Sequence, residues 1–212
     1  EWGGQDLPYP VVRGEAGMVP AEGSTDAFHD LGIQNDLQGV WFHNYVWAGL
    51  HPGALYEVYW YYREHILNPP QFDHQYHHRH FINFMQDIPL ANGHYQDLAA
   101  AVSNPDLRVV GQKDLVNGRA HAWIQNQNHT WRNVTDGVPI PLVSGIVSIA
   151  GFAPDTVCAV KWWNTYTGEI DLLEAVKTDQ QGALQIEIKD LRDDVAVKIG
   201  GSAGDCSALD RG

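Results

Sequence analysis

Residues 143–163 read VSGIVSIAGFAPDTVCAVKWW and contain two short strand-like runs, residues 143–149 and 156–163, separated by a turn with glycine and proline. Both runs are rich in the β-branched and aromatic residues that are typical of strands. Similar runs occupy residues 107–110, 120–125, 183–188 and 195–199. Turn sequences such as Asn117-Gly118 and Gln181-Gly182 separate them. Short strands at this spacing predict an antiparallel β-sandwich.

The first hundred residues follow a different pattern. Residues 1–36 contain many glycines and prolines without a helical or alternating period, which indicates a long loop. Residues 36–50 (DLQGVWFHNYVWAGL) place apolar side chains three and four positions apart, as in an amphipathic helix. Residues 54–62 (ALYEVYWYY) are apolar or aromatic at nearly every position and predict a strand buried on both faces. A second helix is expected over residues 72–85.

The composition limits the classes of function. The chain has 212 residues, of which 44% are hydrophobic and 18% charged, as expected for a globular protein with one large or two small domains. Thirteen basic against 26 acidic residues give a net charge of −13, which would repel a nucleic-acid backbone. No stretch approaches the roughly 20 apolar residues needed to span a bilayer. We therefore expect neither a nucleic-acid partner nor a membrane span.

Aromatic residues are abundant, with 8 Trp, 9 Tyr and 6 Phe beside 11 His. Such a composition favours surfaces that stack and form hydrogen bonds, as carbohydrate-binding surfaces do. Aromatic side chains also fill the cores of β-sandwiches, and composition alone leaves both readings open.

Six short sequence motifs, taken in chain order, carry a family resemblance that covers both parts of the chain. They are Glu1-Trp2-Gly3-Gly4, FHNYVWAGL at 42–50, Trp60-Tyr61-Tyr62, FINFMQDIP at 81–89, RAHAWIQN at 119–126 and KWWNTYTGE at 161–169. Together they resemble the C-terminal part of a cellulase-like (β/α)8 retaining glycoside hydrolase with an appended C-terminal β-sandwich domain. The resemblance implies a mixed fold, α/β plus all-β. The last βα units of a TIM-barrel-like domain would occupy residues 1–104 and an antiparallel β-sandwich residues 105–212.

The resemblance also implies roles for single residues. Glu1 corresponds to the catalytic nucleophile and Trp60 to the aromatic platform under the sugar, while His43, Asn44 and Tyr62 are expected to line the cleft. A retaining mechanism needs a second carboxyl group about 5 to 5.5 Å from the first. In the family this acid/base lies far upstream of the nucleophile. We therefore expect the chain to be incomplete as given and inactive alone, requiring an upstream segment of the same polypeptide or a companion chain.

Two functions remain open on the sequence. The first is a secreted glycoside hydrolase that acts on a polysaccharide or oligosaccharide without a cofactor. The alternative is a non-catalytic extracellular protein, structural or glycan-binding, with the same fold. Carbohydrate is the expected partner in the first case and in the glycan-binding form of the second, and self-association into a homo-oligomer stays open. Upstream sequence would separate them, since an Asn-Glu phrase at the end of a fourth strand favours the enzyme.

Two smaller groups of residues carry further expectations. Cys158 and Cys206 are the only cysteines, and a disulfide between them would suit a secreted protein, with two free buried thiols as the alternative. His74, His77 and His78 have the helical spacing of metal-binding pairs. The same stripe continues through apolar residues, so these rings are expected to be half-buried and hydrogen-bonded, without a metal.

Overall fold

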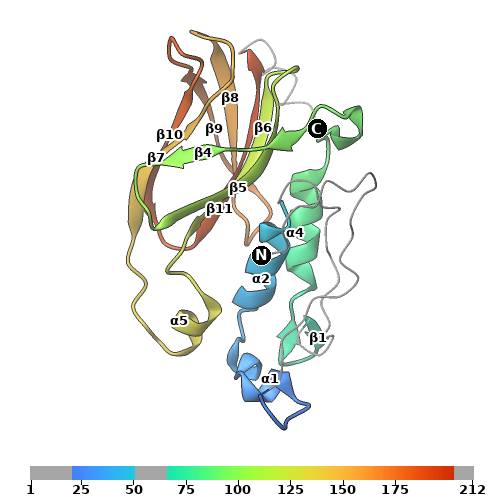
Figure 1. Cartoon of the computed structure of the whole chain (residues 1–212). Coiled ribbons are helices and arrows are strands. Elements are labelled where there is room, and N and C mark those ends of the chain that lie inside the picture. Colours follow the sequence, from blue (N-terminus) through green and yellow to red (C-terminus); the bar gives the residue numbers. More distant parts are fainter. Residues whose placement is uncertain (1–20, 51–65, 203–212) are drawn as a thin grey trace.

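The structure is a computed structural model that describes residues 21–50 and 66–202. Two antiparallel sheets dominate it (Figure 1), one with strand order β3-β5-β6-β11-β8-β9 and one with order β10-β7-β4. The strands of the larger sheet are β3 (Gln96–Asp97), β5 (Leu107–Asp114), β6 (Arg119–Asn126), β11 (Asp194–Ser202), β8 (Val157–Trp163) and β9 (Ile170–Lys177). Those of the smaller sheet are β10 (Leu184–Leu191), β7 (Val143–Ile149) and β4 (Ala100–Val102).

The described residues also include several helical segments. They are α1 (Ala27–Asp30), η1 (Ile33–Asn35), α2 (Val40–Ala48), α4 (Gln75–Met85), η2 (Leu90–Asn92) and α5 (Trp131–Thr135). The two-residue strands β1 (Leu67–Asn68) and β2 (Phe72–Asp73) pair before α4. Among the described residues, no helix has the length and apolar composition required to cross a membrane.

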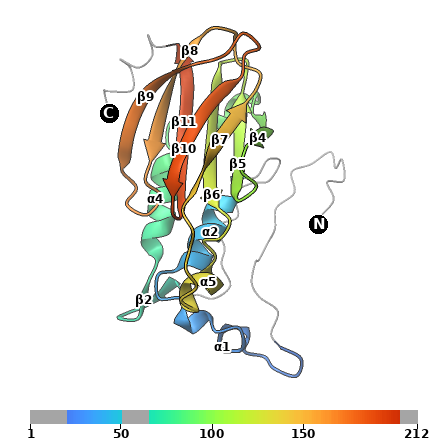
Figure 2. The same cartoon turned by 90° about the vertical axis from the view of Figure 1, so that its left-hand side faces the viewer.

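The main core fills the space between the two sheets. Figure 2 shows the molecule with strands β7 and β10 of the smaller sheet toward the viewer. Strand β6 contributes Ala120, Ala122 and Ile124 on its inner face, and strands of the smaller sheet contribute side chains such as Val147 and Ile186. Alternation along each strand explains this arrangement, because every second residue points to the same face. This core is apolar.

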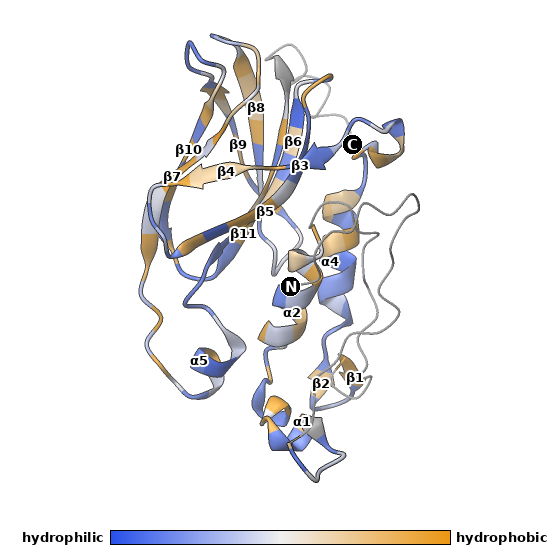
Figure 3. Cartoon of the chain, viewed as in Figure 1, coloured by the Kyte–Doolittle hydropathy of each residue, from blue (hydrophilic) through white to orange (hydrophobic). Residues whose placement is uncertain are grey.

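A second core lies on the outer face of the larger sheet. There Trp123 of β6 and Ala196 of β11 contact apolar side chains of α2 and α4, including Trp47, Phe42 and Phe84. Figure 3 shows that α4 is hydrophilic in its first half and hydrophobic in its second, which lies against the sheet. Strands β6 and β11 are thus covered on both faces, with the smaller sheet on one side and the two helices on the other.

This arrangement corrects the predicted fold class. The expectation of an α/β part built from TIM-barrel βα units is wrong, because the sheets among the described residues are antiparallel and the four α-helices there are short. The physical reason is the burial partner of the helices. Helices α2 and α4 bury their apolar faces on antiparallel strands β6 and β11 instead of on parallel strands. An all-β fold is what the structure supports.

Several elements predicted from the sequence are present. Strand β7 has the predicted bounds, β8 begins one residue later than predicted, and the other four predicted sandwich strands extend or shift by a few residues. Helix α4 begins at Gln75 instead of residue 72, because Phe72 and Asp73 pair with β1. The strand predicted at residues 54–62 lies outside the described residues. The division into domains at residues 104 and 105 stays a prediction.

Cysteine pairing was predicted between the two cysteines of the chain. Cys158 is a free, buried thiol on β8, and its burial raises its pKa. Cys206 lies outside the described residues. The structure therefore gives no support to a disulfide.

Candidate functional site

Helix α2 is held at a defined place by its first turn. The Asp36 carboxylate accepts hydrogen bonds from the backbone N–H groups of Val40 at 2.9 Å and Trp41 at 2.8 Å. Gly39 precedes the helix in the left-handed conformation with φ of 66°, and a Cβ atom there would lie 2.7 Å from Cγ of His74. Both the backbone angle and the close approach require glycine. These contacts fix where α2 begins and which face it turns toward the sheet.

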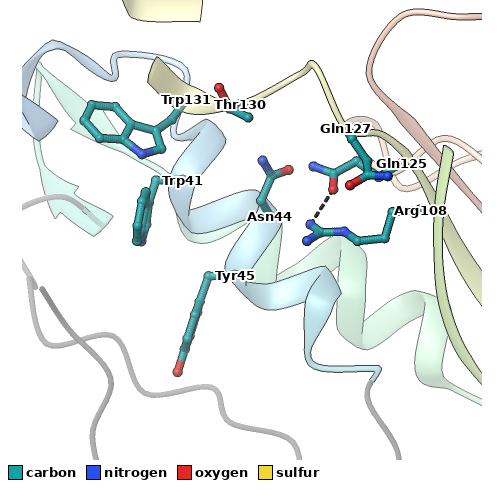
Figure 4. A pocket seen from close by; sticks show the side chains of 8 residues that line it. All are labelled: Trp41, Asn44, Tyr45, Arg108, Gln125, Gln127, Thr130 and Trp131. Atoms are coloured by element: carbon teal, nitrogen blue, oxygen red, sulfur yellow. Dashed lines mark hydrogen bonds between the residues drawn. The ribbon is translucent and has the colours of Figure 1, made fainter. Parts of the chain in front are cut away.

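A pocket of about 400 Å³ opens between α2, the β5–β6 hairpin and α5. Its described lining residues are Trp41, Asn44, Tyr45, Arg108, Gln125, Gln127, Thr130 and Trp131. Figure 4 shows the aromatic side chains at one end and Arg108 with the two glutamines at the other, with Asn44 between them. Small-molecule sites in proteins have volumes of about 300 to 1,000 Å³.

Aromatic side chains form the first end of the pocket. Trp41 and Tyr45 lie one helical turn apart on α2, and Trp41 meets Trp131 edge to face with ring centroids 5.6 Å apart. Trp131 opens α5, whose first turn is capped by Thr130 through a 3.1 Å hydrogen bond from the backbone N–H of Asn133. The Arg132 guanidinium lies 4.3 Å from the centre of the Trp131 ring. Trp131 is therefore fixed by contacts on several sides.

Polar side chains form the other end. Arg108 and Gln125 are directly opposite each other on β5 and β6, and the Arg108 guanidinium donates a hydrogen bond to Oε1 of Gln125. Gln127 donates its amide to the carbonyl of Pro105 at 2.6 Å, which leaves its own oxygen as an acceptor. Asn44 donates to the carbonyl of His129 at 3.2 Å. These side chains are oriented by the protein and still carry free hydrogen-bonding capacity.

A buried polar network adjoins the pocket on the other side of α2. Nε2 of His43 lies 3.0 and 3.1 Å from the two carboxylate oxygens of Asp194, and both side chains are fully buried. Thr165 donates its hydroxyl to Asp194 at 2.5 Å. The ring of Tyr166 stacks on His43 with centroids 4.0 Å apart. Nδ1 of His43 lies 3.0 Å from Nδ1 of His77.

The hydrogen-bond pattern assigns the protons in this network. Nε2 of His77 faces the carbonyl of Gln38 at 3.3 Å and must donate to it, because a carbonyl oxygen only accepts. Burial and then the neighbouring His43 lower the pKa of His77 to about 2, so its ring is neutral and its Nδ1 accepts. Both nitrogens of His43 therefore donate, which makes it an imidazolium paired with the Asp194 carboxylate.

Asp194 is ionised for a matching reason. Burial alone would raise the pKa of its carboxyl group, but the charge of His43 and the hydrogen bonds from His43 and Thr165 outweigh it, and the net shift is downward. The pair joins α2 to β11 across 151 positions of sequence. A pair closed off from solvent in this way has no access to a ligand, so its effect is on structure.

The predicted site residues fall into different places. Asn44 lines the pocket, as expected of a residue in a binding cleft, whereas His43 is enclosed in the buried network and does not line it. Glu1, Trp60 and Tyr62 lie outside the described residues. Of the three histidines with metal-like spacing, His77 contacts His43, while His74 packs beside Gly39. Within the described part of the chain, no group of three histidine, cysteine or carboxylate side chains is arranged to hold a metal.

Most of the residues that line the pocket were not predicted from the sequence. Arg108, Gln125 and Trp131 come from segments that are distant in sequence from α2 and meet it only in the folded chain. One signal was present, the run QNQNHTW at residues 125–131, in which amide side chains precede a tryptophan at the end of a strand. Comparison of the sequence with protein-family models and with curated proteins gives no match.

Proposed function

We propose that this protein binds carbohydrate in the pocket between α2, the β5–β6 hairpin and α5. The observation that carries the proposal is the combination of aromatic rings with oriented amide side chains in one cavity. Aromatic faces stack on the C–H groups of sugar rings, while amides and guanidinium groups bind hydroxyls. The volume of about 400 Å³ suits one or two sugar units, since ligand sites begin near this size.

The proposal is tested by titrating the 212-residue chain with neutral and anionic oligosaccharides and measuring heat or tryptophan fluorescence. Tyr45→Ala should weaken binding about tenfold, because a half-buried aromatic contact contributes roughly the free energy of a tenfold change in affinity. Tyr95→Ala is the matched control, since Tyr95 is also half-buried but does not line the pocket. Binding of no oligosaccharide, or equal losses in both variants, would contradict the proposal.

We further propose that the pocket serves a secreted retaining glycoside hydrolase, the activity implied by the sequence resemblance. Catalysis is then assigned to Glu1, with Trp60 and Tyr62 near the reacting sugar. The 212-residue chain alone should cleave no glycoside, because loss of the acid/base forfeits about 10²- to 10⁴-fold in rate. A polypeptide that carries the upstream segment should be active.

This second proposal has its own test. Glu1→Gln in the longer polypeptide should abolish the covalent glycosyl-enzyme intermediate, detected by mass spectrometry with a slow substrate, and should leave glycan binding by the pocket intact. If the longer polypeptide binds glycan but cleaves none of a broad polysaccharide panel, the alternative of a non-catalytic glycan-binding protein is supported instead.

A further inference from the structure

Arg108 is the only charged side chain among the eight described residues that line the pocket. It lies on β5 and donates one hydrogen bond, to Gln125, out of the five N–H donors of a guanidinium group. Within the part of the chain that the structure describes, no carboxylate lies within ion-pair distance of it. In a chain of 26 acidic and 13 basic residues, a cation without an acidic partner among the described residues is unexpected.

Two contacts hold the guanidinium group in place. Its central carbon lies 5.4 Å from the centre of the buried Trp123 ring, and the hydrogen bond to Gln125 fixes one edge. The Arg108 side chain is exposed on β5, so a ligand can reach its remaining N–H groups, and the partial burial that lowers its pKa leaves it protonated at any physiological pH. A guanidinium group whose orientation is already fixed loses less conformational entropy when it binds an anion than one on a freely moving side chain.

The N–H groups of Arg108 that do not bind Gln125 favour some sugar substituents over others. A neutral hydroxyl offers one oxygen to the guanidinium, whereas a carboxylate or sulfate offers two oxygens at the spacing of its parallel N–H groups. We infer that the pocket recognises an anionic glycan and that Arg108 binds the carboxylate of a uronic acid or the oxygens of a sulfate ester. The aromatic end of the pocket, with Trp41 and Trp131, then stacks on the adjoining sugar ring. The inference rests on the proposed function, because it specifies the ligand of the same pocket.

The net charge of −13 does not oppose this binding mode at short range. Exposed charges are screened beyond about 8 Å at physiological ionic strength. The other described lining residues are neutral, so an anion in contact with Arg108 meets no like charge within the pocket lining.

The test uses three hexasaccharides of equal length, one neutral, one of galacturonic acid and one sulfated, with the 212-residue chain and calorimetry. At least one anionic hexasaccharide should bind about tenfold more tightly than the neutral one, as a bidentate charged contact predicts. Whichever anionic form is preferred identifies the source of the anionic group. Arg108→Gln should remove the preference, because a glutamine amide still binds a hydroxyl but has neither the charge nor the parallel N–H groups that an anion needs. Arg108→Lys should restore only part of it, because lysine keeps the charge but not the fork.

Arg119→Gln is the matched control, since Arg119 is an exposed arginine at the opposite end of the same hairpin and does not line the pocket. It changes the net charge by the same amount and should keep the preference. Circular dichroism and thermal unfolding establish that each variant is folded. Equal affinities for neutral and anionic sugars, or a preference that survives Arg108→Gln, would overturn the inference while leaving carbohydrate binding in place. If the protein binds none of the three hexasaccharides and no other oligosaccharide, both this inference and the proposed function are overturned.

Discussion

The two faces of the larger sheet are covered in physically different ways. The inner face meets the smaller sheet through aliphatic side chains such as Val147, Ile149 and Ile186. The outer face meets α2 and α4 through large aromatic rings and through the buried pair of His43 and Asp194. The first interface depends mainly on buried apolar area, whereas the second also depends on the protonation state of its side chains. Position and chemistry of the pocket follow from the second interface, because α2 provides three of its lining residues.

The largest expected effect is that of low pH, which should destabilise the second interface much more than the first. Burial lowers the pKa of His77 to about 2 and that of His121 to about 3, both from an ordinary value of 6.5. Between pH 6.5 and about 3 the unfolded chain therefore binds more protons at these two positions, and stability falls as the pH falls. Each histidine contributes a slope of about 1.4 kcal/mol per pH unit. Asp194 acts in the same direction at lower pH, because its lowered pKa stabilises the fold above the ordinary value of 3.8.

Urea unfolding followed by circular dichroism between pH 7.5 and 4 measures this slope. His77→Gln should make it shallower by about 1.4 kcal/mol per pH unit, the contribution of one proton. Hydrogen exchange in the same range should show the amides of α2 and α4 opening before those of β7 and β10. A free energy of unfolding that does not change with pH would contradict the assignment of neutral buried histidines.

Removing the carboxylate of the buried pair is expected to have the next largest effect. Asp194→Ala leaves the imidazolium of His43 without its counter-charge, and breaking a buried pair in this way costs about 3 to 5 kcal/mol. Urea unfolding at pH 7 measures the loss. The control is Asp171→Asn on the exposed strand β9, which should change stability by less than about 0.5 kcal/mol. Similar small effects in both variants would show that the pair contributes nothing to the second interface.

The contrast between the two faces also explains what could be predicted from sequence. The strand at residues 143–149 was predicted with its observed bounds, because its apolar alternation needs only local sequence. Strand β9 was missed because it is an edge strand whose sequence IDLLEAVK is mostly exposed and includes several good helix formers. Helix α2 was predicted, but its packing partners Trp123 and Ala196 come from strands far along the chain, and local sequence contains no information about them.

The same limit applies to the site. Asn44 was predicted as a binding residue, whereas its neighbour His43 was placed in the same cleft although its ring points into the buried network. Adjacent residues on a helix point about 100° apart, so membership of a motif does not place both in one site. The charge of Arg108 could be read from the sequence, but its position opposite Gln125 and beside α2 arises only from strand pairing and helix packing.

A third prediction examines the apolar interface. Ile149→Val removes one methylene from the core between the sheets, where Ile149 is fully buried, and should lower the free energy of unfolding by about 0.5 to 1.5 kcal/mol. The loss should be the same at pH 7 and pH 5, since Ile149 packs in the apolar cluster between the sheets. Urea unfolding at both values provides the measurement. A loss that doubles at pH 5 would mean that the two interfaces are coupled and that the first also depends on protonation.

The smallest effect is expected from a substitution of Tyr166, whose hydroxyl is a buried polar group in the second interface. The ring stacks on His43, but its hydroxyl is buried and has no hydrogen-bond partner among the described residues. Burial, followed by the nearby carboxylates of Asp194 and Asp193, raises its pKa well above the ordinary value, so the hydroxyl stays neutral. Tyr166→Phe keeps the stacking and removes a dehydrated hydroxyl, and it should therefore leave stability unchanged or raise it by up to about 1 kcal/mol.

Thr165→Val is the informative comparison, because the Thr165 hydroxyl donates to Asp194 and its loss should cost about 1.5 to 3 kcal/mol, as for other hydrogen bonds to charged groups. If Tyr166→Phe were instead as destabilising as Thr165→Val in urea unfolding, the Tyr166 hydroxyl would have a stabilising partner, and the buried network would extend beyond His43, His77, Thr165 and Asp194.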